Sequence, residues 1–167
     1  MKEKATSLRW FIWVPFLVLI DQLTKSWILK TLSIGETIPL MPGLRLTLAH
    51  NYGIAFGMFN NDNLLVTRFI LLAIAIAITV FISVWLYKTP RTEKWVCSAL
   101  VLILGGALGN IIDRFMHGHV IDFIDCYYKN WHWWTFNIAD SFITVGAVLL
   151  LKTILFEEKD SSKAHKA

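Results

Sequence analysis

The amino-acid sequence predicts an all-α polytopic membrane protein, with four transmembrane helices and a small extracytoplasmic β-sheet after the first of them. Three observations predict this fold class. Hydrophobic residues make up 56% of the 167 residues and charged residues only 17%, whereas soluble domains carry about 25% charged residues. The apolar residues form four long runs, and the basic residues gather between those runs. A chain this small cannot hide so much apolar surface from water, so we expect lipid to be its solvent.

The four apolar runs predict helices over residues 10–29, 64–87, 95–112 and 138–156, each about as long as the 17–25 residues that a span needs. The first run follows three basic residues, as a secretory signal sequence does. It also contains Asp21 and Lys25 and has no small-residue cleavage site after it. We therefore expect a helix that is retained in the mature protein.

The distribution of basic residues predicts the orientation of these helices. Residues 1–9, 88–94 and 152–167 hold ten Lys and Arg, whereas the two long connections, 30–63 and 113–137, hold four. The positive-inside rule places both termini in the cytoplasm and the two long connections outside. The aromatic run at 131–134, just before the fourth helix, then suits an aromatic belt at the outer membrane surface.

The first outer connection carries a strand pattern. Leu44, Leu46 and Leu48 alternate with polar residues, and this period of two indicates a half-buried strand. We expect a small sheet within residues 37–59, with an irregular loop as the alternative. Residues 1–156 then form a single four-helix membrane domain. The charged, aperiodic residues 157–167 predict a disordered cytoplasmic tail.

Polar residues recur at the outer ends of the first and third helices. Asp21 and Lys25 are four residues apart and so share one helix face, where they either form an ion pair or contact a substrate. Asp113 and Arg114 follow Asn110 at the end of the third helix. Arg114 either binds a carbonyl or phosphate oxygen or extends to the membrane surface. Gly105 and Gly109 also lie on the third helix, spaced so that another helix can approach closely.

Two aspartates are predicted to meet at the outer face. Asp122 lies among Val, Ile and Phe residues, a setting that favours a protonated carboxyl group. Asp140 falls in the first turn of the fourth helix, where Asn137 could cap the N-terminus and the helix dipole favours an anion. Two such carboxyl groups within a few ångströms share a proton. They could therefore act as the acid–base pair of a hydrolase. Asp125 is expected to be solvated.

The remaining candidates are weaker. Asn51 offers a donor and an acceptor at the outer surface, although its segment alone resembles a turn. His117 and His119 are expected to be solvated loop residues, because the histidines lack ligand spacing. No metal or cofactor is predicted. Cys97 and Cys126 are not expected to form a disulfide, because one lies within an apolar run and the other outside.

Five short motifs, in order along residues 8–156, resemble those of the bacterial lipoprotein signal peptidases, the signal peptidase II family of membrane aspartic proteases. Ile54 departs from the second motif, where a smaller residue is common. The motifs are Asp21-Gln22 with Lys25; Asn51, Gly53, Ala55 and Phe56; Gly109-Asn110 with Asp113-Arg114; Val120, Asp122 and Phe123; and Phe136-Asn137 with Ala139-Asp140.

The resemblance implies an aspartic endopeptidase of the bacterial cytoplasmic (inner) membrane, a monomer that uses no metal or cofactor. Its substrates would be prolipoproteins carrying diacylglycerol on a cysteine, cleaved just before that residue, and globomycin-type peptides would inhibit it. Asp122 and Asp140 would be the catalytic pair. The resemblance also implies two supporting sets: substrate-binding Asn51, Asn110, Arg114 and Asn137, and structural Asp21, Lys25 and Asp113.

Two other functions are consistent with parts of the pattern. Intramembrane acids are common in ion-coupled transporters, but those usually place the acids near the midplane and contain internal repeats. Here the acids gather at one face and we find no repeat. The glycine pair could instead serve a non-enzymatic scaffold for partner helices, in which Asp122 and Asp140 would be dispensable.

Overall fold

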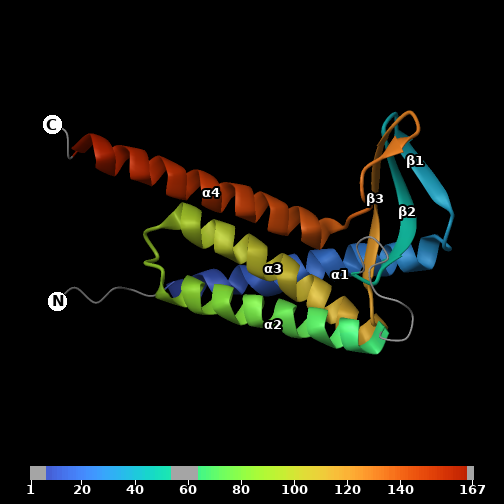
Figure 1. Ribbon diagram of the computed structural model, residues 1–167, viewed down its shortest axis with the longest axis horizontal. Coiled ribbons are helices and arrows are strands. Elements are labelled where there is room, and N and C mark those ends of the chain that lie inside the picture. The colour runs from blue at the N-terminus through green and yellow to red at the C-terminus, as the bar shows by residue number, and fades with distance from the viewer. Residues whose placement is uncertain (1–6, 54–63, 165–167) are drawn as a thin grey trace.

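The computed structural model describes residues 7–53 and 64–164. Four helices run side by side, with both ends of the described chain at the same end of the bundle (Figure 1). They are α1 (Trp13–Thr31), α2 (Leu64–Lys88), α3 (Lys94–His117) and α4 (Ile138–Ala164), and a short 3-10 helix, η1 (Ser7–Ile12), precedes α1. Each of the four contains a stretch long and apolar enough to cross a membrane, which confirms the four predicted apolar helices.

Two helices, α3 and α4, run well past their predicted ends. The helix α3 continues from residue 112 to His117, and Gly118 ends it in the left-handed conformation (φ 74°) that favours glycine. The backbone of α4 is helical to Ala164, whereas the sequence predicted disorder from residue 157. That prediction relied on charge, but the Glu, Lys and Ala residues of this segment are good helix formers. Residues 165–167 lie outside the described residues.

The central helix of the bundle is α3. About 56% of its most apolar stretch is buried, against 22% or less in the other three helices. Glycines bring the neighbours close: a Cβ at Gly105 would lie 2.8 Å from Leu17 Cβ, and one at Gly106 would overlap the carbonyl oxygen of Ala139. The close approach predicted from Gly105 and Gly109 is confirmed, because both glycines lie against α1, at Leu17 and Asp21. Gly106 sets the start of α4 against α3.

We expect Gly106→Ala to destabilise the protein by about 1–3 kcal/mol, because the added methyl group meets backbone rather than a movable side chain. Thermal unfolding in detergent measures the loss. Ala77→Val is the matched control, because it adds apolar volume on an exposed position of α2. An unfolding temperature that drops equally in both variants would contradict the prediction.

A four-stranded antiparallel sheet lies at one end of the bundle, in the order β1-β2-β3-β4 (Figure 1). Its strands are β1 (Thr37–Met41), β2 (Leu44–Asn51), β3 (Val120–Tyr128) and β4 (Trp131–His132). The predicted sheet is confirmed for β1 and β2, while residues 54–59 lie outside the described residues. The sequence missed β3, because its first four residues are all buried and a strand buried on both faces shows no alternation.

The sheet packs onto the end of α1 through one apolar cluster. Ile28 of α1 and the following Leu32 belong to this cluster, together with Leu46 and Leu48 of β2 and Ile121 of β3. The register of β2 and β3 sets Ala49 opposite Asp122 and Asn51 opposite Val120. This packing therefore holds the two strand segments of the candidate site beside the helix ends.

Candidate active site

Two asparagines connect the two predicted aspartates. Asn137 Nδ2 donates to Asp122 Oδ1 (2.7 Å), and Asn110 Nδ2 donates to Asp140 Oδ1 (2.8 Å). The Asn137 amide also donates to Asn110 Oδ1 (3.2 Å). We call Asn110 and Asn137 the amide bridge. The structure thus brings Asp122 of β3 and Asp140 of α4 to one polar centre at the same end of the bundle.

The start of α4 fixes the position of Asp140. Asn137 Oδ1 accepts a hydrogen bond from Asp140 N (2.9 Å), and Asp140 Oδ2 accepts one from Asn137 N (3.2 Å). This reciprocal arrangement is a capping box, and it confirms Asn137 as the helix cap. These two hydrogen bonds hold the Asp140 carboxyl group at the N-terminus of α4.

Asp122 has a different environment. Its side chain is buried, at 2% exposure, and Asn51 Nδ2 donates to its second oxygen (2.9 Å). Asn51 is itself oriented, because its Oδ1 accepts the backbone N–H of Gly53 (2.8 Å). Burial raises the pKa of Asp122 to about 6; the charge of Asp140 adds to the shift, and the two asparagine amides oppose it.

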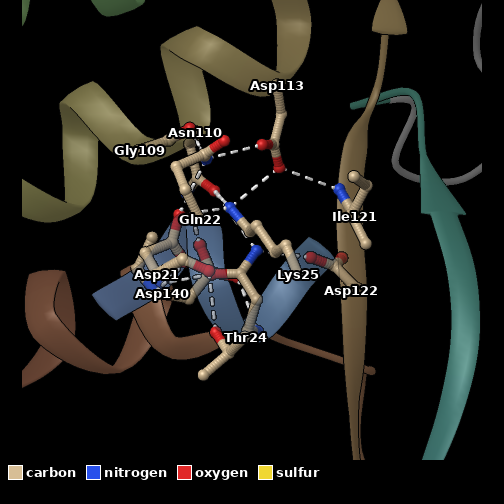
Figure 2. A network of polar contacts seen from close by, with 12 residues as sticks. Asp21, Gln22, Thr24, Lys25, Gly109, Asn110, Asp113, Ile121, Asp122 and Asp140 are labelled. Carbon is tan, nitrogen blue, oxygen red and sulfur yellow. Dashed lines mark hydrogen bonds and ion pairs between the residues drawn. The ribbon is translucent and has the colours of Figure 1, made fainter. Parts of the chain in front are cut away.

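Beneath this centre lies a buried ion cluster formed by Asp21, Lys25 and Asp113 (Figure 2). Lys25 Nζ lies 2.8 Å from Asp21 Oδ2 and 2.8 Å from Asp113 Oδ2. Its third hydrogen bond goes to Asn110 Oδ1 (3.1 Å), so all three ammonium donors have partners. Each member of the cluster is at most 1% exposed. Of the two roles left open for Asp21 and Lys25, the structure supports the ion pair that fixes packing.

The buried ion cluster also holds the backbone next to each candidate catalytic residue. Asp21 Oδ1 accepts the N–H of Ala139 (3.0 Å), which precedes Asp140. Asp113 Oδ2 accepts the N–H of Ile121 (3.1 Å), which precedes Asp122. The cluster therefore links α1 and α3 to both segments that carry the aspartates. Gln22 adds a hydrogen bond to Asp113 (2.9 Å); the sequence placed it in a motif but assigned it no role.

Arg114 is half-buried, and its Nη1 donates to the carbonyl oxygen of Asn110 (3.2 Å). It lines a cavity of about 280 Å³ that Asn51 also lines.

Two predictions outside this centre are wrong. Asp125 is 3% exposed rather than solvated, because Arg45 Nε (2.6 Å) and His132 Nδ1 (2.9 Å) contact it. Burial tends to raise its pKa, but these partners hold that pKa below its usual value. His119 is half-buried, and its ring is stacked 4.0 Å from that of His50. Burial and the neighbouring His50 and His117 lower its pKa.

Two other expectations, on His117 and on the cysteines, are met. His117 is exposed, as predicted. Cys97 and Cys126 are both free thiols, which confirms that they form no disulfide. Among the side chains that the structure describes, no group of three or more His, Cys, Asp or Glu residues is placed to hold a metal ion.

The fold and the site define a polytopic helical membrane protein with a polar two-carboxylate centre at one end of its bundle. The family model described as Signal peptidase (SPase) II matches residues 13–156. The chain therefore belongs to the signal peptidase II family, as its motifs suggested. It is a membrane protease whose reaction is the removal of signal peptides from prolipoproteins. This membership decides against the transporter and the scaffold.

Individual relatives agree with this assignment. The chain is 44% identical over 149 residues to a lipoprotein signal peptidase of Alteromonas mediterranea, covering 89% of this chain and 81% of the relative. It is 44% identical over 147 residues to a lipoprotein signal peptidase of Escherichia coli, covering 88% and 89%. A solved bacterial membrane enzyme structure, determined by the in meso method at 2.3 Å resolution, superposes with a TM-score of 0.76 at 31% identity, covering 92% of this chain and 90% of that one.

Proposed function

We propose that Asp122 and Asp140 are the catalytic pair of this peptidase, and that it cleaves diacylglyceryl-modified prolipoproteins just before the lipidated cysteine. The supporting observation is the amide bridge, which joins both carboxyl groups to one polar centre. The two groups have unlike environments, one buried and one at a helix N-terminus. Unlike environments of this kind allow one carboxyl group to act as the general acid and the other as the general base.

In the mechanism that follows from this contrast, Asp140 is the general base and Asp122 the general acid. Asp140 removes a proton from a water molecule as the water oxygen attacks the scissile carbonyl carbon. Asp122, protonated, donates its proton to the developing oxyanion. When the tetrahedral intermediate collapses, the proton taken by Asp140 passes to the leaving nitrogen. The C–N bond breaks, and Asp122 recovers its proton from the new carboxyl group.

Four further side chains position the reactants. Asn51 and Arg114 line the cavity and contact the substrate, whereas Asn110 and Asn137 hold the two carboxyl groups in register. The buried ion cluster of Asp21, Lys25 and Asp113 acts on the substrate only through the backbone that it fixes.

The active site lies at the outer face of the bacterial inner membrane, and both termini are cytoplasmic. The excess of Lys and Arg at the opposite end of the bundle supports this orientation. Trp131 of β4 is exposed, and so are Trp133 and Trp134, which follow this strand; tryptophan is enriched at membrane–water interfaces. The enzyme acts as a monomer on substrates that diffuse in the lipid.

The direct test is to incubate the purified protein with a diacylglyceryl-modified precursor and with the same precursor before lipidation. We expect release of the signal peptide from the modified precursor alone, with the new N-terminus at the lipidated cysteine, and inhibition by globomycin. Equal cleavage of both precursors, or cleavage at another bond, would contradict the proposal.

The pH profile tests the assignment of Asp122 as the acid. Its pKa of about 6 means that it loses its proton as the pH rises through that value. We expect kcat/KM to fall on the alkaline side with an apparent pKa near 6. Because the Asn51 amide favours the ionised carboxylate, Asn51→Ala should move this limb to higher pH. A limb that moves to lower pH would contradict the assignment.

A further inference from the structure

The cavity beside the catalytic pair has two kinds of wall. Leu65, Phe69 and Leu72 line it from the outer end of α2, which lies beside the passage from α3 into β3 in Figure 1. Arg68 and other polar side chains complete the wall. The cavity adjoins the catalytic centre, because Asn51 both lines it and donates to Asp122.

Arg68 presents an unused donor in this wall. Its Nε is buried and has no hydrogen-bond partner among the residues that the structure describes. The guanidinium lies 5.1 Å from the centre of the Tyr52 ring, and a Cβ at Gly118 would lie 3.1 Å from Arg68 Nη1. Aromatic stacking and close backbone packing thus hold it, and no ion pair involves it within the described part of the chain. A buried donor left unpaired is costly, so a ligand atom that accepts from it would bind favourably.

We propose that this cavity is the subsite for the ester-linked lipid group of the substrate, and that Arg68 positions this group by donating to an ester carbonyl oxygen. The inference rests on the function proposed above. The lipidated cysteine directly follows the scissile bond, so its lipid must lie next to the catalytic pair. The apolar side chains of α2 contact the acyl chains, and the guanidinium binds the oxygens where those chains begin. A separate phospholipid in this cavity would exclude the lipidated residue.

The test compares two substrates that differ only in the carbonyl oxygens: a diacyl ester precursor and a dialkyl ether analogue with chains of equal length. For the wild-type protein we expect kcat/KM to be about tenfold higher for the ester, mainly through a lower KM. Arg68→Gln should raise KM for the ester to the value for the ether. It should change KM for the ether, and kcat for both substrates, by no more than about twofold.

Two variants separate this role from charge and from stability. Arg68→Lys keeps the charge but lacks Nε and the planar arrangement of donors, so it should recover less than half of the discrimination. Arg91→Gln removes an exposed charge between α2 and α3 and should leave kcat and KM unchanged for both substrates.

Equal losses on both substrates in Arg68→Gln would show a structural role and overturn the proposal. A second outcome would also overturn it. If the loss of activity in Arg68→Gln, assayed in lipid vesicles, depended on their content of anionic phospholipid and not on the ester group, the cavity would hold a phospholipid headgroup. A wild-type protein that cleaves neither substrate would instead refute the proposed function itself.

Discussion

Asp122→Asn and Asp140→Asn are each expected to reduce kcat/KM by about 10²–10⁴-fold, because each removes one partner of the general acid–base pair. An asparagine keeps the shape of the side chain and one acceptor oxygen for the amide bridge. The fold should therefore survive the loss of proton transfer. Initial rates on the diacylglyceryl precursor, with unfolding temperatures recorded beside them, measure both properties.

The control for this result is Glu36→Gln, which neutralises an exposed carboxylate that accepts the backbone N–H of Ser33. It should retain cleavage within about twofold. Near wild-type cleavage by either aspartate variant would remove that residue from the catalytic pair. The double variant should be little worse than the single ones, because residues that act as a unit are not additive.

Lys25→Met should give the largest loss of stability. Lys25 is the cation that contacts both Asp21 and Asp113 in the buried ion cluster. Without it the two carboxylates remain buried and uncompensated, and breaking such a pair costs about 3–5 kcal/mol. Thermal or chemical denaturation in detergent measures the loss in the free energy of unfolding. Activity should fall as well, because the cluster holds the N–H groups of Ala139 and Ile121.

A triple variant separates charge from packing in this cluster. Asp21→Asn and Asp113→Asn added to Lys25→Met remove the unpaired charges but keep oxygens that accept the two backbone donors, and most of the lost stability should return. Lys30→Met, at an exposed position in the last turn of α1, should change stability by less than about 0.5 kcal/mol. If Lys25→Met unfolds no more easily than this control, Lys25 does not stabilise the site.

Local features of the site could be predicted from the sequence. The four spans follow from runs of apolar residues, the Asp21–Lys25 pair from a spacing of four on a helix, and the Asn137 cap from its place before the fourth run. Each depends on residues close together along the chain, within one turn for the pair and the cap and within one apolar run for a span, so the sequence pattern is sufficient.

Contacts between distant segments could not be predicted in this way. The hydrogen bond from Asn51 to Asp122 spans 71 residues and depends on the register of β2 and β3. Asp125 was expected in solvent because its partner Arg45 lies 80 residues away. The sequence also did not predict that Asn110 and Asn137 connect the two carboxyl groups. Both were expected to bind substrate, and their position between Asp122 and Asp140 depends on the packing of the helices and strands.

The central claim is that Asp122 and Asp140 form one coupled acid–base centre, and the protonated carboxyl band in infrared difference spectra tests it most directly. At about pH 5, below the pKa of Asp122, the spectrum of the wild-type protein minus that of Asp122→Asn should show the band of one protonated carboxyl group. In Asp140→Asn that band should titrate at lower pH, because the neighbouring charge that raises the pKa of Asp122 is gone. A band that survives in Asp122→Asn, or that titrates at the same pH without Asp140, would contradict the coupling.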